Sequence, residues 1–261
     1  MKRGWFLRTH TFLVYVFLYA PIAILVLFSF NKTSQTAVWQ GLTLEWYRNL
    51  MHDEVILLSV RNSLVVGVAT TVIATVIGTL AALAMGRFEF RGKGMTKNLL
   101  YLPIIIPEIV IGAALVTFFG AARLRLSILT VVIAHVVFSI SYVTIVVRAR
   151  LSGFDRSLEE AALDLGARPV QTFFRVTLPL ILPGIVSGAL LVFTVSIDDY
   201  VITSFVAGVG STTLPLQIYS MLKVGVTPEV NAVSTLLLAV TVLLIVVAQR
   251  LQQPPPERSE G

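Results

Sequence analysis

Three acidic side chains stand within long apolar stretches of the sequence, where a carboxylate could bind a cation. Glu108 lies in "YLPIIIPEIVIG", directly after Pro107, and Asp198 and Asp199 lie in "SIDDYVITSFVAG". A charged side chain at the centre of a bilayer costs about 2.5–3.5 kcal/mol on translocon scales, so such groups are candidate functional residues. Two adjacent carboxylates repel each other, and a bound cation relieves that repulsion.

Each of these acids also has a plainer interpretation. Glu108 could be a protonated or locally paired carboxyl at a helix bend, because Pro107 removes a backbone donor. Asp198 and Asp199 could form an ordinary interfacial stop if the apolar helix ends there. If the helix instead continues towards Ala207, both carboxylates lie in its outer third. The pattern leaves these alternatives open.

Other chemistries find little support in the sequence. The chain has no cysteine, which excludes disulfides, cysteine-ligated zinc and thiol catalysis. A phosphate-cradling loop needs the pattern G-x4-GK-[ST], and the nearest approach, "GRFEFRGKG" at residues 86–94, has five intervening residues and lacks the hydroxyl. No nucleophile–base or metal-ligand spacing stands out. We expect no catalytic residue, no metal site and no cofactor in this chain.

The acidic residues are set in a composition typical of membrane proteins. Of 261 residues, 56% are hydrophobic and 13% charged, and the mean hydropathy is +0.86, whereas a soluble domain carries about 25% charged residues. A bilayer core needs about 20 apolar residues of helix. Six runs of that kind are predicted spans: Thr11 to Phe30, Ser63 to Gly86, Leu99 to Ala122, Leu126 to Val147, Val176 to Ile197 and Val230 to Gln249.

The basic residues predict the orientation of these spans. With the amino terminus inside, 14 Lys and Arg residues fall on the cytoplasmic side and six on the outer side. Such a bias places both termini in the cytoplasm. It also accounts for the net charge of +6 without a nucleic-acid partner.

The rest of the chain offers few domain boundaries. We expect residues 1–250 to form a single membrane domain and residues 251–261, "QQPPPERSEG" with the preceding Leu251, to be a disordered cytoplasmic tail. The outer loop from Asn31 to Asn62 contains Trp39, Trp46 and Tyr47, whose amphipathic rings favour the membrane interface.

A polar insert, "SLEEAALDLGARPV" at residues 157–170, lies between the fourth and fifth predicted spans. Ser157 and Glu160 have the spacing of a capping box, which predicts the start of a short helix. Gly166 suits the left-handed residue that ends such a helix, and Pro169 suits the first turn of another. The apolar residues of the first helix fall on one narrow stripe: Leu158, Ala161, Ala162 and Leu165.

A helix of this length is unstable alone in water, because nucleation is costly. It must therefore pack against something. One possibility is its own membrane domain. The other is a groove on a separate protein, in which an amphipathic helix inserts its apolar face.

The insert and the residues after it resemble the EAA loop of binding-protein-dependent ABC importer permeases. That pattern is EAA-x3-G-x9-I-x-LP, and it lies between the fourth and fifth of six spans. The matching residues here are Glu160-Ala161-Ala162, Gly166, Val176 and Leu178-Pro179, with Val176 in place of the usual isoleucine.

This resemblance implies an all-α integral membrane protein of about six transmembrane helices with the type I ABC importer permease fold. The insert would be a coupling helix that docks on a cytoplasmic ATPase. The residues expected to couple to the ATPase are Glu160, Ala161, Ala162, Leu165, Gly166 and Arg168. A Glu160 that caps its own helix would be less free to contact that partner, and both roles stay open.

The resemblance also implies partners and a location. The expected partners are a second permease subunit forming a heterodimer, two copies of the ABC ATPase, which carry ATP and Mg²⁺, and an extracytoplasmic substrate-binding protein. The expected location is the inner membrane of a bacterium.

The acidic residues point to the kind of substrate. Carboxylates suit an ammonium group or a metal ion, whereas importers of oxyanions would need basic or donor-rich groups. The stretch from Ser196 through "DDYVITSFVAGVGSTTLP" resembles the corresponding region of spermidine/putrescine importer permeases, in particular their C-type subunit. The candidate substrate-binding residues are Glu108, Asp198, Asp199 and Tyr200. The resemblance implies that a polyamine is imported into the cytoplasm, with another cation or small solute as the alternative substrate.

A proton-coupled secondary transporter that uses the same acids as its relay is the alternative class. It would leave the cytoplasmic insert unexplained. Within the spans, we expect His135 to hydrogen-bond a neighbouring helix rather than to titrate during transport. Gly184 and Gly188 form a small-xxx-small face that permits close helix approach, either inside the chain or against a second permease.

Overall fold

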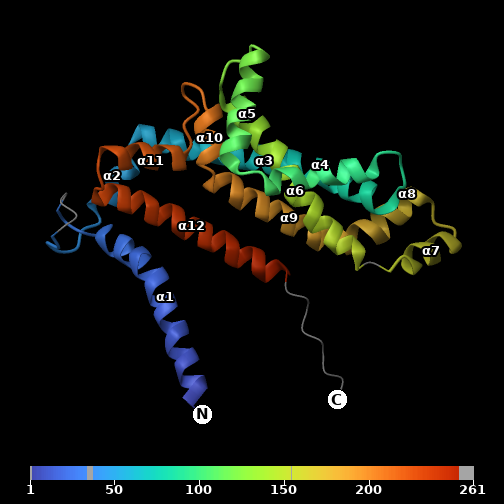
Figure 1. Cartoon of the computed structure of the whole chain (residues 1–261), viewed down its shortest axis with the longest axis horizontal. Helices are drawn as coiled ribbons and strands as arrows, with labels where there is room; N and C mark the ends of the chain where they lie inside the picture. The colour runs from blue at the N-terminus through green and yellow to red at the C-terminus, as the bar shows by residue number, and fades with distance from the viewer. Residues whose placement is uncertain (1, 34–37, 154, 253–261) are drawn as a thin grey trace. The chain divides into compact units, whose positions relative to one another are not determined.

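A computed structural model describes residues 2–33, 38–153 and 155–252, and these residues fold almost entirely into helices (Figure 1). The elements in chain order are α1 (Lys2–Phe28), α2 (Glu45–Leu50), α3 (Glu54–Arg87), α4 (Lys93–Ile105), α5 (Glu108–Ala121), α6 (Ile128–Ser152), α7 (Ser157–Asp164), α8 (Pro169–Thr172), a π-helical turn η1 (Phe173–Thr177), α9 (Leu178–Asp198), α10 (Val201–Val206), α11 (Leu214–Val224) and α12 (Pro228–Gln252). Within the described residues, an isolated bridge between Asn31 and Leu42 is the only β-type pairing. The predicted all-α class is confirmed.

Five helical stretches in the described residues are long and apolar enough to cross a membrane. They are Leu7–Phe28, Glu54–Arg87, Ile128–Ser152, Pro169–Asp198 and Pro228–Val246. A sixth crossing is possible if α4 and α5 together count as one broken span. The number of spans therefore agrees with the sequence prediction, apart from the form of the third.

The third span, predicted over Leu99 to Ala122 with a possible bend before Glu108, is divided between α4 and α5. Helices α4 and α5 are bent by 110° at the break between them. Ile106 is extended, with φ −72° and ψ 132°, because the ring of a following proline disfavours the helical conformation. Pro107 then precedes the first residue of α5 and offers no backbone N–H.

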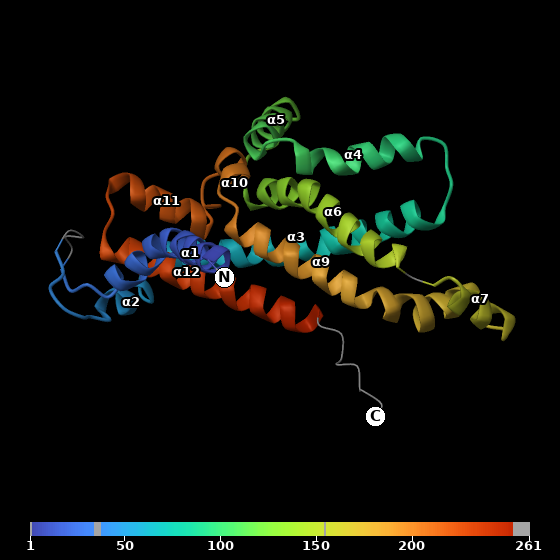
Figure 2. The same ribbon diagram turned by 60° about the horizontal axis from the view of Figure 1, so that its bottom comes forward.

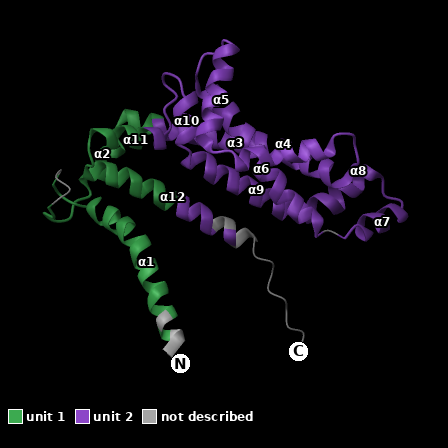
Figure 3. Cartoon of the chain, in the orientation of Figure 1, with its two compact units in different colours: residues 1–58, 217–240 green, residues 59–216, 241–261 purple. Residues whose placement is uncertain are grey.

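The chain divides into two compact units, shown in green and purple in Figure 3. The first comprises residues 1–58 and 217–240. In it, the Tyr47 hydroxyl lies 2.6 Å from the Ser29 Oγ, and the Trp46 indole donates to the Asn31 carbonyl at 2.8 Å. The predicted outer loop is therefore partly helical, since α2 lies within it and α3 begins at Glu54.

The second unit comprises residues 59–216 and 241–261, and its described part contains both candidate sites. Here α6 packs closely on α9. A Cβ added to Gly184 would lie 2.9 Å from the Arg150 Cβ, and one added to Gly188 would lie 3.4 Å from the Val143 Cα. The predicted close approach at these glycines is confirmed, and it occurs inside the chain.

Two buried clusters stabilise this unit. One joins α3, α5, α6 and α10 through residues that include Val66, Phe119, Phe138 and Ile202. The other joins α3, α6 and α9 around Val143 and further small or branched side chains. Figures 1 and 2 show α5 and α10 at one end of the unit and α7 at the opposite end. The two candidate sites therefore lie at opposite ends of the same packed helices.

Candidate functional site

The predicted short helix is present as α7, but it begins at Ser157 itself, and the predicted capping box, with Ser157 as the N-cap, is wrong. The N-cap position is Arg156, and no side chain at that position bonds the first turn. Instead, the Asp155 Oδ1 accepts the Ser157 backbone N–H at 2.9 Å. This bond holds the pKa of Asp155 below its usual value. The Asp155 carboxylate, two residues upstream, thus takes the place expected for the Ser157 hydroxyl. The exposed Glu160 does not act as a cap.

The turn after α7 agrees with the sequence prediction. Gly166 has φ +87°, and the Ala167 N–H donates to the Ala162 carbonyl at 3.0 Å. Pro169 occupies the first turn of α8. A Cβ on Gly166 would meet nothing within 4 Å, so only its backbone conformation calls for glycine here.

The apolar stripe of α7 is largely exposed. Leu158 is 48% exposed and Leu165 is 89% exposed, while Ala161 is also exposed and Ala162 is half-buried. No residue of α7 is fully buried. The stripe is therefore not the surface by which α7 contacts the rest of its own chain, and it is available to another protein.

Helix α7 is instead held to its own chain through Glu159. The Glu159 carboxylate pairs with Arg87, the last residue of α3, and accepts a hydrogen bond from the Thr177 hydroxyl. Arg87 also donates to the Thr177 Oγ1 at 3.3 Å. Beside this contact, Arg156 donates to the Gly86 carbonyl at 3.1 Å. Sequence reasoning missed this cluster, since 72 positions separate Arg87 from Glu159.

The π-helical turn η1 places Thr177 in that cluster. Thr177 is fully buried and is followed by Leu178 and Pro179, the last residues of the EAA-like pattern, which begin α9. The proline at the start of α9 has no N–H to donate to the preceding turn. The regular α-helical hydrogen-bond pattern is therefore interrupted here. The LP pair of the pattern therefore marks the junction between the insert and a membrane-spanning helix.

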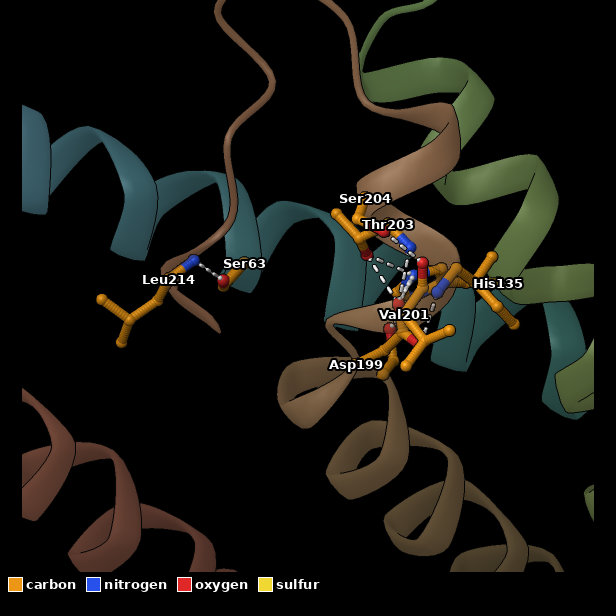
Figure 4. Close-up of polar contacts among 9 residues, drawn as sticks. Ser63, His135, Asp199, Val201, Thr203, Ser204 and Leu214 are labelled. Carbon is orange, nitrogen blue, oxygen red and sulfur yellow. Dashed lines mark hydrogen bonds and ion pairs between the residues drawn. The ribbon is translucent and has the colours of Figure 1, made fainter. Parts of the chain in front are cut away.

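At the other end of the unit, Asp199 lies in a buried polar cluster between α9 and α10 (Figure 4). Helix α9 ends at Asp198, and Asp199 is extended, with ψ 123°. Its Oδ2 accepts the Thr203 N–H at 2.8 Å and the Thr203 hydroxyl at 2.7 Å. The Asp199 Oδ1 accepts the Ile202 N–H at 3.3 Å. Asp199 thus caps the helix that follows it.

His135 of α6 completes this cluster. Its Nε2 lies 3.2 Å from the Asp199 Oδ2 and 3.0 Å from the Thr203 Oγ1. Its Nδ1 lies 2.8 Å from the Ser196 Oγ of α9. The prediction that His135 hydrogen-bonds a neighbouring helix is confirmed. Through these contacts, the His135 imidazole links α6, α9 and α10.

The other candidate substrate residues lie around this cluster with different exposure. Asp198 and Glu108 are exposed, and Tyr200 is half-buried. Glu108 begins α5, and α5 packs on α10, the helix that follows Asp199. Of the four candidate substrate residues, only Asp199 is buried.

A polar contact on the same unit fixes the segment before α11. The Leu214 N–H donates to the Ser63 Oγ of α3 at 2.8 Å (Figure 4). The neighbouring Asn62 amide donates to the carbonyls of Gly210 and Thr212, both at 2.9 Å. Sequence reasoning also missed this contact. In the described part of the chain, no three His, Cys, Asp or Glu residues are grouped so as to hold a metal ion.

The fold resembles those of solved membrane transporters. One is a bacterial alginate ABC transporter in complex with a periplasmic protein bound to an alginate pentasaccharide, with a TM-score of 0.75 at 17% identity, covering 97% of this chain and 95% of that one. Another is the MetNI methionine ABC transporter in an inward-facing conformation, with a TM-score of 0.61 at 19% identity, covering 81% and 98%. The architecture is that of a type I ABC importer permease.

Sequence comparison agrees and is more specific. Residues 74–254 match the family described as binding-protein-dependent transport system inner membrane component. The chain is 42% identical over 231 residues to the putrescine transport system permease protein PotI of Escherichia coli strain K12, covering 86% of this chain and 82% of that protein. It is 40% identical over 242 residues to the spermidine/putrescine transport system permease protein PotC of Haemophilus influenzae, covering 93% and 94%. The chain belongs to the family of binding-protein-dependent transport system inner membrane components.

Proposed function

We propose that this chain is the permease subunit of an ATP-driven importer that moves a polyamine into the cytoplasm. The observation that carries the proposal is the identity of 40–42%, over most of the chain, to two permeases named for putrescine and spermidine. In this assignment both termini lie in the cytoplasm of a bacterium, in keeping with the charge bias of the loops. Residues 1–250 act as one membrane domain. Of residues 251–261, expected to form a tail, Leu251 and Gln252 end α12, and 253–261 lie outside the described residues.

The energy comes from a separate ATPase in this proposal. The exposed stripe of α7, with Glu160 and Arg168 beside it, supports docking in a groove of that partner. Two ATPase copies bind ATP and Mg²⁺, one beneath this chain and one beneath a second permease that completes a heterodimer. When ATP binding closes the ATPases, α7 moves with them and the spans change from inward-facing to outward-facing.

The substrate arrives from an extracytoplasmic binding protein, at the end of the unit opposite α7. Glu108, Asp198 and Asp199 supply negative charge there, and the Tyr200 ring offers a face to an ammonium group. The exposed Asp198 and Glu108 are free to approach the substrate directly. Asp199, whose oxygens bond Thr203, acts on the substrate through its charge and by holding the junction of α9 and α10.

Uptake by the reconstituted importer tests this function. Proteoliposomes holding this chain, the second permease and the ATPase, with the binding protein outside, should accumulate radiolabelled putrescine or spermidine when ATP is enclosed. Uptake should persist when an uncoupler collapses the proton gradient. Transport of neither polyamine, with uptake of a sugar or an oxyanion instead, would overturn the assignment, and loss of uptake on uncoupling at constant ATP would favour a secondary transporter.

A further inference from the structure

A cavity of about 440 Å³ lies where the ends of α3 and α6 meet the start of α4 and the insert. Four cationic side chains line it, Arg87, Lys93, Arg148 and Arg156, and the one acid that lines it is Glu159. The volume falls within the range of about 300–1,000 Å³ that is usual for small-molecule sites. The cavity is separate from the acidic residues assigned to the substrate, which lie at the other end of the unit.

The positive charge of this cavity is only partly compensated. Arg87 pairs with Glu159, and Lys93 pairs at 2.7 Å with Glu89, which is 89% exposed and does not line the cavity. Arg156 donates to a backbone carbonyl, which carries no net charge.

Arg148 and Arg156 therefore have no anionic partner in the described part of the chain, and Arg148 also lacks a neutral one. Arg148 is half-buried, and within the described part of the chain it makes no hydrogen bond or ion pair. Like charges held close together destabilise their charged forms. A cavity lined in this way suits an anion.

We propose that this cavity binds a phosphate group, supplied by the headgroup of an anionic phospholipid or by free phosphate. Guanidinium forks match phosphate oxygens in a bidentate geometry, and three of the four cations are arginines. Helices α3 and α6 are each long and apolar enough to cross a membrane, and they end at Arg87 and at Ser152, four residues after Arg148. The cavity therefore lies at the level where a lipid headgroup meets the protein, as basic pockets between membrane helices do for other acidic lipids.

The proposed site is linked to the insert. A phosphate in the cavity would compete with Glu159 for Arg87. Phosphate binding would therefore affect the Arg87–Glu159 contact, which holds α7 to the spans. The positive charge also repels a polyamine, so the cavity is not a second substrate site. The inference goes beyond the proposed function and holds whichever solute is transported.

Lipid retention by the full chain tests the site. The protein is purified within its complex, exchanged into nanodiscs of equal parts phosphatidylcholine and phosphatidylglycerol, and released for native mass spectrometry. The test variant is Arg148→Gln, which removes no bond of the described fold. The matched control is Arg91→Gln, an exposed arginine of the neighbouring turn that does not line the cavity.

The two sources of phosphate give different results. If the ligand is the lipid, the wild-type chain and Arg91→Gln should retain phosphatidylglycerol over phosphatidylcholine, and Arg148→Gln should retain about tenfold less, as for one lost charge-assisted bond. If the ligand is free phosphate, inorganic phosphate should bind to the wild-type chain in nanodiscs of neutral lipid. Its affinity should fall by a similar factor in Arg148→Gln. The proposal is overturned if all three proteins behave alike in both arms, or if Arg148→Gln weakens only ATPase binding, which would make the cavity a protein contact.

Discussion

Glu159 of α7 pairs with Arg87 at the end of α3, and Thr177 donates a hydrogen bond to the same carboxylate. The residue beside the Glu160 of the EAA-like pattern thus ties the insert to two membrane-spanning helices. The Arg87 and Glu159 side chains are 29% and 17% exposed, so the pair is partly shielded from water. In the proposed mechanism, this contact carries a movement of α7 to α3 and, through Thr177, to α9.

Breaking the pair should uncouple the insert from the spans. In Glu159→Gln the charge-assisted bonds are weakened by about 1.5–3 kcal/mol, so uptake should fall while ATP hydrolysis continues. Hydrogen exchange of the α7 amides should become faster. Glu160→Gln is the matched control, because Glu160 is exposed and should leave α7 exchange unchanged. Equal exchange rates in wild type and Glu159→Gln would show that the pair does not hold α7.

The turn at Gly166 should tolerate no β-branched side chain. A residue with a Cβ at φ +87° costs about 1–2 kcal/mol relative to glycine, and the eight-residue α7 has little stability of its own. Gly166→Val should abolish uptake and the coupling of ATP hydrolysis to it, while membrane insertion stays normal. Gly94→Ala is the control, since that position is equally open but has no positive φ. Normal transport by Gly166→Val would remove the turn from the mechanism.

Gly208 should be irreplaceable for a different reason, the lack of space. A Cβ there would lie 1.8 Å from the Leu126 carbonyl oxygen, and backbone rather than a flexible side chain would have to move. Gly208→Ala should lower the free energy of unfolding by about 1–3 kcal/mol or more, measured as a lower midpoint of thermal unfolding in detergent. Gly120→Ala, where a Cβ meets nothing within 4 Å, should be neutral or slightly stabilising. A Gly208→Ala protein as stable as wild type would contradict the close approach.

Substitution of the two adjacent aspartates, Asp198 and Asp199, should have different effects on uptake and on stability. Asp198→Asn should raise the KM for polyamine uptake by about tenfold, equivalent to about 1.4 kcal/mol, with no change in thermal unfolding. Asp199→Asn should also destabilise the protein, because the bonds from Thr203 and His135 lose their charged acceptor. Unchanged uptake kinetics in Asp198→Asn would take that residue off the substrate path. Unchanged stability in Asp199→Asn would mean that the cap is dispensable.

The sequence predicted best those features that depend on local chemistry. The left-handed turn at Gly166 and the helix start at Pro169 were predicted from the residues next to them in the sequence, and both were confirmed. The capping prediction at Ser157 failed because Asp155, two positions earlier, offers a competing acceptor. Pro107 indicated a bend in the third span, but the sequence did not predict that the bend would reach 110° and divide the span into two helices.

Contacts between distant segments could not be predicted from spacing. Arg87 and Glu159 meet only because α3 and the insert converge at one end of the unit, and neither residue has a neighbour that indicates the pairing. The same holds for Asn62, which bonds carbonyls about 150 positions away. His135 could be assigned a neighbouring helix as its partner, but not the three residues that it joins.

Crosslinking from Leu165 tests most directly whether α7 transmits work from another chain. The natural sequence has no cysteine, so Leu165→Cys can be labelled alone with a maleimide benzophenone and photolysed in the assembled complex. We expect a crosslink to the ATPase, and ATP binding should alter its yield. Val209→Cys, fully exposed at the opposite end of the same unit, should give none. A Leu165 adduct found only within this chain, with the ATPase bound and active, would contradict the account.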